Sequence, residues 1–433
     1  MIYLLYDIVQ FLLLPVVVPY QMNRSLKRGM GLQGFGERFG LIQREAFHEP
    51  CTGETIWVHA VSVGETIAVR PLLVALKKQY PKKRILLSTV TETGRAVSEK
   101  FVEIDCRVYF PFDNYFFVRR SLKAVRPSLV IIVETEIWPN FLRAAKNMGI
   151  PVVLTNGRIS DRSFGRYLKL KWFFRPVLAN VTALCMQTAE DAKRIIAIGA
   201  NPARVNVSGN LKYDIPVNTP TAEMKSELRT TSKIPDDILV VTAGSTHEGE
   251  EEIILSVYRR LQAEGRECLL ILVPRHPERK AQIAELLTKS SIPFTLHSAL
   301  NQRKDWFRAG EVLLVDTMGE LMRYYAISDL SFVGGSLVPT GGHNIMEPAS
   351  LGVPVIFGPN MQNFRESAAL IQKYGGGFQV KDGTELTALM HDLLDDDEKR
   401  CEAGRNGMKL LQENSGATRM QMEVIAEFLK VDQ

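Results

Sequence analysis

The segment Ile56-Trp57-Val58-His59-Ala60-Val61-Ser62-Val63-Gly64-Glu65-Thr66 decides how the first half of this chain folds. Its first part, 56–60, is a short apolar run typical of a strand buried on both faces of a parallel sheet. A glycine turn and a helical stretch at 68–79 follow. Such a turn presents its last side chain and the first amides of the helix at the rim of the sheet. We therefore expect the Glu65 carboxylate to lie at that rim.

The carboxylate of Glu65 allows two interpretations. If it faces a ligand cleft, it is placed to take a proton from the hydroxyl of an acceptor. Alternatively, it only complements the positive N-terminus of the helix in which it lies. The pattern of residues by itself favours neither interpretation over the other.

Short apolar runs alternate with helical stretches through both halves of the chain. Further strands are predicted at 84–90, 129–134, 151–155, 184–187 and 205–208, and then at 238–243, 268–273, 312–316, 330–333 and 353–357. Helical stretches between them, such as 140–148, make βαβ units. The polar stretch at 214–233 lacks apolar periodicity, which is typical of a linker. We expect two doubly wound α/β domains that bind ligands at the carboxyl ends of their strands, in a cleft between the domains.

Length and composition agree with two globular domains. The chain has 433 residues, of which 45% are hydrophobic and 23% charged. Its formal net charge of +5 suits an anionic membrane surface or phosphorylated substrates. The five cysteines are scattered and lack metal-ligand spacing, which favours a reducing, cytosolic compartment. Nothing in the sequence indicates a nucleic-acid partner or sets an oligomeric state.

Motifs for metals and dinucleotides are absent from the sequence. There is no H-E-x-x-H, no Walker loop and no spaced set of histidines and cysteines. The only Asp-x-Asp, at 395–397, lies in an acidic run typical of a helix end. The G-x-G-x-x-G fingerprint of dinucleotide-dependent oxidoreductases is also missing. We therefore predict neither a metal site nor a cofactor.

The first twenty residues are almost wholly apolar, and Arg24, Lys27 and Arg28 follow them. This order is the reverse of a cleaved signal peptide and keeps the body of the protein on the cytoplasmic side. Four residues in this segment disfavour a membrane-spanning helix: Asp7, Gln10, Pro15 and Pro19. We expect an uncleaved anchor that spans the membrane or lies in its interface, the alternative being a buried core helix. The stretch 162–175 mixes basic and aromatic residues, which suits either a membrane surface or an amphipathic core helix.

Charged residues that could take part in catalysis or bind phosphate follow several predicted strands. Glu134, in the segment 133–139, ends a predicted strand, where an unpartnered carboxylate is unfavourable. It therefore either has a specific functional role or forms a structural ion pair with an arginine such as Arg158. Lys212, in 208–212, offers a cation that can stabilise charge on a leaving phosphate. In the second half, Arg275 offers a guanidinium suited to phosphate.

Two further groups follow strands of the second half. The segment 316–321 follows one strand and begins a helix. The glycine-rich residues 334–336 and 341–348 offer backbone amides that can cradle phosphate, and Glu347 can accept hydrogen bonds from a ribose. Several phosphate-suited strand ends in one half are stronger evidence for a nucleotide site than any single one of them.

Taken together, these motifs resemble the 3-deoxy-D-manno-octulosonic acid (Kdo) transferase family over nearly the whole chain. The ordered set is Gly34-Phe35-Gly36-Glu37-Arg38-Phe39-Gly40, H-x-V-S-V-G-E at 59–65, E-T-E-x-W-P at 134–139, G-N-L-K at 209–212, P-R-H at 274–276, M-G-E-L at 318–321 and G-G-H-N-x-x-E-P at 341–348. Phe35 departs from the tryptophan expected there. The resemblance implies a GT-B fold with two Rossmann-like domains, CMP-Kdo as donor, and the tetra-acylated lipid A precursor (lipid IVA) as acceptor.

The patterns described above and the resemblance together give domain bounds and residue roles. We expect a membrane anchor at 1–22, an acceptor domain at 23–214, a linker at 215–232, a CMP-sugar domain at 233–412 and a C-terminal helix at 413–433. Glu65 is the implied general base, and Glu134 and Lys212 assist the transition state. The implied donor contacts are Pro274, Arg275, Met318, Gly319, Glu320, Asn344, Ile345, Met346 and Glu347. The expected reaction is an inverting, metal-independent transfer at the cytoplasmic side of the inner membrane.

Three other functions compete with this expectation. A GT-B enzyme that uses a UDP-sugar, either a transferase or an epimerase, shares the fold, although an epimerase has no use for a lipid anchor. A dinucleotide-dependent oxidoreductase lacks its fingerprint here. A non-catalytic lipid-binding scaffold would keep its function without the Glu65 carboxylate.

Overall fold

The computed structural model describes residues 2–27, 34–42, 54–215, 217 and 220–429. The chain forms two compact units, one made of Met1–Asp214 with Asn414–Gln433 and the other of Ile215–Glu413. Each unit contains one seven-stranded sheet in which all neighbouring strands are parallel. The prediction of two parallel α/β sheets is therefore confirmed.

The sheet of the first unit has the order β3-β2-β1-β4-β5-β6-β7. Its strands are β1 (Thr55–His59), β2 (Arg84–Thr89), β3 (Cys106–Tyr109), β4 (Pro127–Val133), β5 (Val152–Gly157), β6 (Ala183–Met186) and β7 (Val205–Val207). Its helices are α1 (Ile2–Lys27), α2 (Val63–Ala68), α3 (Arg70–Gln79), α4 (Glu92–Ser98), α5 (Tyr115–Val125), α6 (Pro139–Asn147), α7 (Asp161–Lys169), α8 (Lys171–Leu178), α9 (Ala189–Ile198) and α18 (Ala417–Ala426). Ile56 and Val58 pack into one apolar cluster and Trp57 into another. Strand β1 is thus buried on both faces, as its apolar run predicts.

The sheet of the second unit has the order β10-β11-β9-β8-β12-β13-β14. Its strands are β8 (Leu239–Thr246), β9 (Cys268–Pro274), β10 (Phe294–Leu296), β11 (Val312–Leu314), β12 (Leu330–Val333), β13 (Val355–Phe357) and β14 (Gly377–Gln379). Its helices are α10 (Ala222–Thr231), α11 (Glu250–Ala263), α12 (Lys280–Lys289), α13 (Leu321–Ala326), α14 (Met346–Ser350), α15 (Arg365–Tyr374), α16 (Gly383–Asp395) and α17 (Asp397–Asn414). The carboxyl ends of β8, β9, β11 and β12 meet at one edge because these strands are parallel neighbours.

The stretch predicted as a linker, 215–232, contains the helix α10 and lies in the second unit. Thr221 caps the helix by accepting a hydrogen bond from the amide of Met224. Arg229, only 8% exposed, donates to the carbonyls of Pro235 and Ile238 and pairs with Asp329 at 3.1 Å. A buried guanidinium, rather than an apolar stripe, holds this helix in place, and apolar periodicity therefore could not reveal it.

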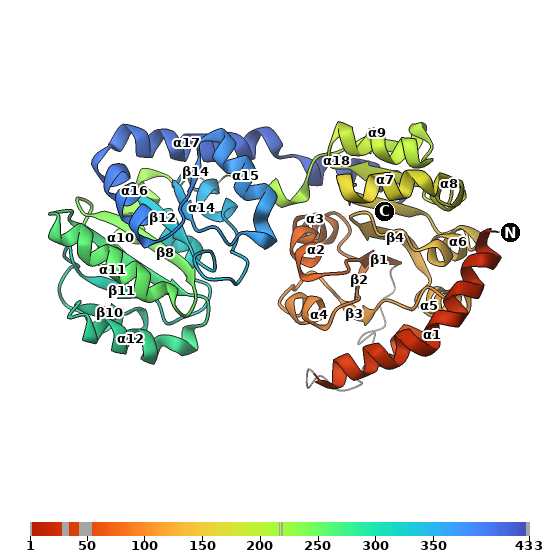
Figure 1. The fold of residues 1–433 in the computed structure, drawn as a ribbon, viewed down its shortest axis with the longest axis horizontal. Helices are drawn as coiled ribbons and strands as arrows, with labels where there is room; N and C mark the ends of the chain where they lie inside the picture. Colours follow the sequence, from red (N-terminus) through yellow and green to blue (C-terminus); the bar gives the residue numbers. More distant parts are fainter. Residues whose placement is uncertain (1, 28–33, 43–53, 216, 218–219, 430–433) are drawn as a thin grey trace. The chain divides into compact units, whose positions relative to one another are not determined.

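The last helix, α18, belongs to the first unit although it follows the whole second unit in sequence (Figure 1). It packs against α3, and its Met422 and Ile425 lie in the same apolar cluster as Leu211. Asp214 accepts hydrogen bonds from the amides of Gly416 at 2.8 Å and Thr418 at 2.5 Å. One carboxylate thus joins the point where the chain leaves the first unit to the point where it returns.

Helix α1 lies along the part of the first unit that carries α5 and α6 (Figure 1). The Tyr6 hydroxyl donates to Asp113 at 2.8 Å, Asp7 accepts from Asn140 at 2.7 Å, and Tyr3 accepts from Asn180 at 2.7 Å. These contacts, which involve Tyr3, Tyr6 and Asp7 of the predicted anchor, attach the helix to the body of the unit. Its other side exposes apolar side chains: Leu4, Leu5, Ile8, Phe11, Leu12 and Val16. The alternative of a buried core helix is therefore wrong.

No helix in the described part of the chain is long and apolar enough to cross a membrane. The predicted amphipathic stretch at 162–175 forms two helices, α7 and α8, which meet at Leu170. Phe173 and Phe174 pack against the core, whereas Leu170 and Trp172 are exposed. The stretch therefore combines a core-facing side with an exposed apolar side.

The aromatic residue at position 35 lies in the short 3₁₀ turn Phe35–Phe39. Its ring lies 5.9 Å from that of Phe39 and 6.3 Å from that of Phe112. Arg38 of the same turn donates to the carbonyl of Val90 at 2.7 Å, and Glu37 accepts from the amide of Tyr109. The turn ties the segment before β1 to the loops of the sheet, and phenylalanine supplies aromatic contacts at this position.

Asp113 is a stability determinant of the first unit. Its carboxylate, 3% exposed, accepts hydrogen bonds from the amides of Asn140 and Phe141 and from the Tyr6 hydroxyl. Asp113→Asn replaces one acceptor oxygen by an NH₂ group that cannot accept, so we expect a loss of about 1–3 kcal/mol in unfolding free energy. Urea unfolding measures this loss. The exposed Glu99→Gln, in the same unit, is the control, and equal stability of the two variants would contradict the prediction.

Candidate active site

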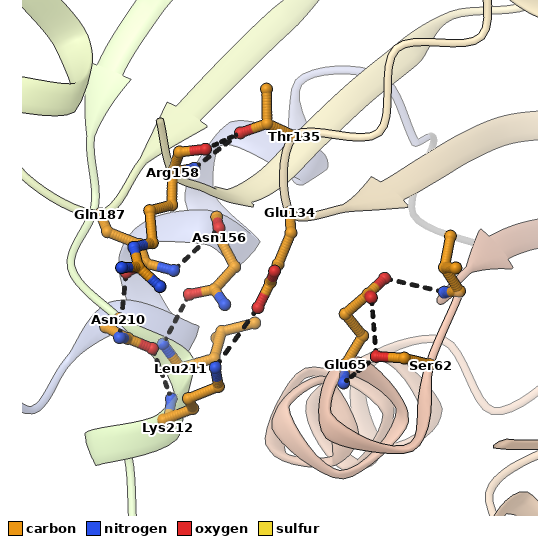
Figure 2. Close-up of polar contacts among 11 residues, drawn as sticks. Ser62, Glu65, Glu134, Thr135, Asn156, Arg158, Gln187, Asn210, Leu211 and Lys212 are labelled. Atoms are coloured by element: carbon orange, nitrogen blue, oxygen red, sulfur yellow. Dashed lines mark hydrogen bonds and ion pairs between the residues drawn. The ribbon is translucent and has the colours of Figure 1, made fainter. Parts of the chain in front are cut away.

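The carboxyl edge of the first sheet brings three predicted residues to one region (Figure 2). Glu65 lies on α2 after β1, Glu134 follows β4, and Lys212 lies in the 3₁₀ turn Leu211–Tyr213 after β7. The Glu134 carboxylate points toward Lys212, whose Nζ is 3.3 Å from Oε1 of Glu134. The negative charge of Glu134 also acts on Glu65. The three residues therefore form one electrostatic group.

Glu65 lies at the start of α2 and accepts hydrogen bonds there. Its Oε2 accepts from the amide of Val61 at 2.7 Å and its Oε1 from the Ser62 hydroxyl at 2.8 Å, while Ser62 caps α2. The carboxylate is thus part of the helix N-terminus. Burial, assisted by the nearby charges of Glu134 and Glu136, nevertheless raises the pKa of Glu65 to about 7 against the effect of these hydrogen bonds. A carboxyl group with a pKa near neutrality is suited to accepting a proton.

Glu134 has an unusual backbone conformation. Its φ of 60° lies in the left-handed region, which is uncommon for a residue other than glycine. The amide of Glu134 still donates to the carbonyl of Thr155 on the neighbouring strand at 2.8 Å. The chain therefore turns away from the sheet directly at Glu134. The ion-pair partner that the structure shows is Lys212, where the sequence suggested Arg158. Arg158 instead holds the following residue, because its amide donates to the Thr135 hydroxyl at 2.8 Å.

A chain of buried amide side chains positions Lys212 (Figure 2). Asn156 Oδ1 accepts from the amide of Leu211 at 3.0 Å, and the Asn156 carbonyl accepts from Gln187. The Gln187 Oε1 accepts from Asn210, whose own Oδ1 accepts from the amide of Lys212 at 2.9 Å. Sequence analysis did not single out Asn156 or Gln187. They could have been recognised from their positions, since each is a polar residue at or just after the end of a buried strand.

The predicted donor residues lie at the carboxyl edge of the second sheet. Pro274 ends β9, Met318, Gly319 and Glu320 follow β11, and Asn344 to Glu347 lead into and begin α14. The Arg275 side chain is exposed there, and Met318 is 63% exposed although it is apolar. Glu320 pairs with Arg323 at 3.5 Å. One face of one unit thus offers a guanidinium and an exposed thioether.

Glu347 is held at this edge by Asn344. The Asn344 Nδ2 donates to Glu347 Oε1 at 3.2 Å, and the Asn344 Oδ1 accepts from the amide of Met346 at 3.1 Å. Burial raises the pKa of Glu347, against the hydrogen bond from Asn344 and the charge of Arg275. Among the described residues no hydrogen bond is donated to the Oε2 of Glu347, and this partly buried oxygen is suited to accepting one from a ligand hydroxyl.

The glycine-rich segment 334–336 does not offer the open amides that its sequence suggests. The amides of Gly335, Ser336 and Leu337 all donate to the carboxylate of Glu250, at 2.6, 2.9 and 2.8 Å. Glu250, at the start of α11, is fully buried and also accepts from the amide of His247 at 3.0 Å. The expectation that these amides cradle a phosphate is therefore wrong, because an internal carboxylate occupies them.

Among the described residues, no group of three or more histidines, cysteines and carboxylates is arranged to hold a metal ion. Of the four described cysteines, Cys106, Cys185 and Cys268 are buried and Cys401 is exposed. Burial raises the pKa of each of the three buried thiols, which behave as small apolar residues.

Comparison with known proteins identifies the family. The family model described as 3-deoxy-D-manno-octulosonic-acid transferase (kdotransferase) matches residues 33–215. The 3-deoxy-D-manno-octulosonic acid transferase of Haemophilus influenzae is 35% identical over 96% of this chain and 96% of its own length. The chain belongs to the Kdo transferase family. It is therefore a glycosyltransferase.

Two other proteins extend the comparison. The 3-deoxy-D-manno-octulosonic acid transferase of Chlamydophila psittaci is 30% identical over 95% of this Kdo transferase and 93% of its own length. A solved UDP-GlcNAc 2-epimerase from Neisseria meningitidis, bound to UDP-GlcNAc, covers 86% of this chain and 100% of its own, with 16% identity and a TM-score of 0.53. At that identity the likeness shows the fold alone. It supports a GT-B-like architecture of two parallel seven-stranded sheets.

The contribution of the hydrogen bonds between Glu250 and the amides of residues 335–337 can be measured. In Glu250→Gln an NH₂ group faces backbone amides that already donate, so we expect the second unit to lose about 1–3 kcal/mol of stability. Urea unfolding followed by the fluorescence of Trp306, the tryptophan of this unit, measures the loss. Glu248→Gln, an exposed change two residues away, is the control. Unaltered unfolding of Glu250→Gln would show that the carboxylate does not hold the segment.

Proposed function

We propose that this chain transfers Kdo from CMP-Kdo to the lipid A precursor lipid IVA in a single inverting displacement that needs no metal ion and no cofactor. Membership of the Kdo transferase family supports the sugar. The observation that carries the proposed chemistry is the group formed by Glu65, Glu134 and Lys212 at one sheet edge. Within that group, one carboxyl has a pKa near neutrality and the other is paired with a cation.

Glu65 is the proposed general base. Its ionised carboxylate takes the proton from a sugar hydroxyl of the acceptor, and the hydroxyl oxygen forms a bond to the anomeric carbon of Kdo. The bond from that carbon to the phosphate oxygen breaks, and its electron pair leaves with CMP. Each oxygen of Glu65 accepts one hydrogen bond in the structure, so each retains a lone pair for the incoming proton.

In this proposal Lys212 stabilises the charge on the departing phosphate, and Glu134 holds Lys212 in position. The lysine, 35% exposed, carries a positive charge that can stabilise negative charge on the departing phosphate. Its ion pair with Glu134 and the amide chain from Asn156 to Asn210 hold the ammonium group at the sheet edge. The ion pair is partly exposed, so its contribution is positional, and exposed pairs add only about 0–1 kcal/mol to stability.

The second unit is the proposed donor-binding unit. Arg275 is suited to an anionic group, Met318 to the face of a base, and Glu347 to ribose hydroxyls. The remaining predicted contacts, Pro274, Gly319, Glu320, Asn344, Ile345 and Met346, supply backbone and packing around them. The fold is shared with a UDP-sugar epimerase, so release of CMP rather than UDP from the donor separates this proposal from its rival.

The pH dependence of the reaction tests the base. Since the Glu65 pKa is raised to about 7, kcat/KM should rise with pH and level off above neutrality, with its acid limb near pH 7. Glu65→Gln should lower kcat by about 10²- to 10⁴-fold, because the amide cannot take the proton. Mass spectrometry of the lipid product formed from CMP-Kdo and lipid IVA measures both effects. Glu99→Gln is the control, and Kdo transfer by Glu65→Gln at the wild-type rate would exclude this role.

We also propose that the protein binds the cytoplasmic surface of the inner membrane through the exposed side of α1 and the α7–α8 junction. Leu4, Phe11, Leu12 and Val16 of α1 are each at least 65% exposed, and Trp172 is 56% exposed. The opposite, polar side of α1 is attached to the unit by Tyr6 and the residues already described, so the apolar side is presented outward. Exposed apolar side chains beside an aromatic indole suit the interface between headgroups and acyl chains.

Vesicle binding tests this surface. Leu12→Glu should weaken co-sedimentation with vesicles that contain an anionic lipid by about tenfold, since burial of one leucine contributes about 1.5–3 kcal/mol. Val102→Glu, at an 89% exposed position in the same unit, should bind as the wild type does. Transfer of Kdo to a delipidated, water-soluble acceptor should stay unchanged in both variants. Equal vesicle binding by both variants would place the membrane contact elsewhere.

A further inference from the structure

Two histidines form a hydrogen-bonded pair at the carboxyl edge of the second sheet. The Nε2 atoms of His247, after β8, and His343, after β12, lie 2.8 Å apart, and the two ring planes differ by 10°. The ring of His276, after β9, lies 5.9 Å from that of His247, nearly at a right angle to it. Both paired rings are partly exposed, so a ligand can reach them. None of the proposed donor contacts includes this pair.

The surrounding loops are built to hold the pair. The amide of His247 donates to the buried Glu250, which also binds the amides of the glycine segment. Gly335, with φ of 67°, lies so close to His343 that a Cβ atom there would be 2.9 Å from the imidazole. A side chain at position 335 would therefore displace the ring. Backbone geometry on both sides fixes the contact.

Several groups at this edge that could bind an anion are already occupied by partners within the protein. The amides of Gly335 to Leu337 are already bound to Glu250. Arg279 is paired with the buried Glu251, and Lys280 is paired with Asp316. Arg275 is exposed and makes no side-chain hydrogen bond or ion pair within the described residues. Arg275 and the histidines are thus the positive or protonatable groups that are free to receive a phosphate.

The pair has a specific proton chemistry. A nitrogen-to-nitrogen hydrogen bond between two imidazoles needs one N–H and one lone pair, and it survives the addition of one proton but not of two. Burial lowers the pKa of His343 to about 4, helped by the neighbouring His247, Arg275 and His276. Burial also lowers the pKa of His247, against the charge of Glu250 and together with His276, Arg275 and Arg279. The free pair is therefore neutral at pH 7, and an anion placed beside it favours uptake of a proton.

We propose that His247 and His343 bind the phosphate of the donor nucleotide as a hydrogen-bonded pair that carries one proton in the complex. This assignment rests on the proposed function, in which the second unit binds CMP-Kdo. When the bond to Kdo breaks, its electron pair stays on a phosphate oxygen and CMP gains a second negative charge. The N–H groups of the charged pair donate to the phosphate at that moment, while the acceptor proton goes to Glu65, so no further reactant is needed.

Calorimetric titration of the full chain with CMP and with cytidine separates phosphate binding from base binding. His343→Gln and His247→Gln should each weaken CMP binding by about tenfold or more, because a hydrogen bond to a charged group contributes about 1.5–3 kcal/mol. Cytidine has no phosphate, so its affinity should stay unchanged in both variants. His391→Gln, in α16 of the same unit, is the control and should bind both ligands as the wild type does.

Proton uptake is the second readout. Titrations at pH 7 in two buffers of different ionisation enthalpy should show that wild-type protein takes up protons on binding CMP and that His343→Gln takes up fewer. The ionisation of CMP itself is common to both proteins and cancels in the difference. Unchanged CMP affinity in the variants, equal loss of CMP and cytidine binding, or equal proton uptake would each overturn the assignment. Failure of the wild-type protein to bind CMP at all would instead contradict the proposed donor.

Discussion

Buried carboxylates that accept hydrogen bonds from backbone amides are the constraint on which the loops of both sheets depend. Glu250 binds four amides of two loops in the second unit, and Asp113 binds two at the start of α6 in the first. The partly buried Asp214 binds two at the start of α18, and the buried Asp191 binds the amide of Ile159. A buried carboxylate without partners is very unfavourable, so each loop is held in the conformation that satisfies its carboxylate.

This constraint explains how one residue of the candidate site can have a structural role together with the chemical role that we propose. Glu65 accepts from Val61 and Ser62 and so stabilises the start of α2. The same burial that makes these bonds necessary raises its pKa to about 7. The two interpretations that the sequence left open are therefore compatible. A carboxylate fixed by the loop it stabilises is held at a constant place and orientation, as a general base must be.

The constraint also limits where a phosphate can bind in the second unit. A glycine-rich turn ordinarily exposes amides that bind phosphate. Here Glu250 occupies the amides of residues 335–337 from inside the protein. Arg275 and the pair of His247 and His343, which we propose as phosphate ligands, lie at the same edge. Side chains that titrate make the affinity depend on pH, whereas backbone amides do not.

Much of the fold could be predicted from the sequence, because continuous apolar runs such as 129–133 mark strands buried on both faces. Helix α10 could not be predicted from apolar periodicity, because its buried anchor is Arg229. Short strands without a long apolar run, such as β10 and β14, were missed for a similar reason. The strand-end positions of Glu65, Glu134 and Lys212 could be predicted from motifs, and these residues do lie at one edge.

The partners of these residues could not be predicted, because they depend on contacts between distant segments. The ion pair of Glu134 joins residues 78 positions apart, and the bonds from Glu250 to the glycine segment span 85 or more. The pattern of residues in a sequence indicates local periodicity, but it does not show which distant segments come into contact. The polar side of α1 shows the same limit, since Asp7 weakens a spanning helix in the sequence but binds Asn140 in the structure.

A crystal structure of the full chain with CMP tests the central constraint most directly. We predict that the phosphate of CMP lies within hydrogen-bonding distance of Arg275 and of the pair formed by His247 and His343, and that Glu250 keeps the amides of residues 335–337. The account would be contradicted by a complex in which those amides turn away from Glu250 and bind the phosphate themselves.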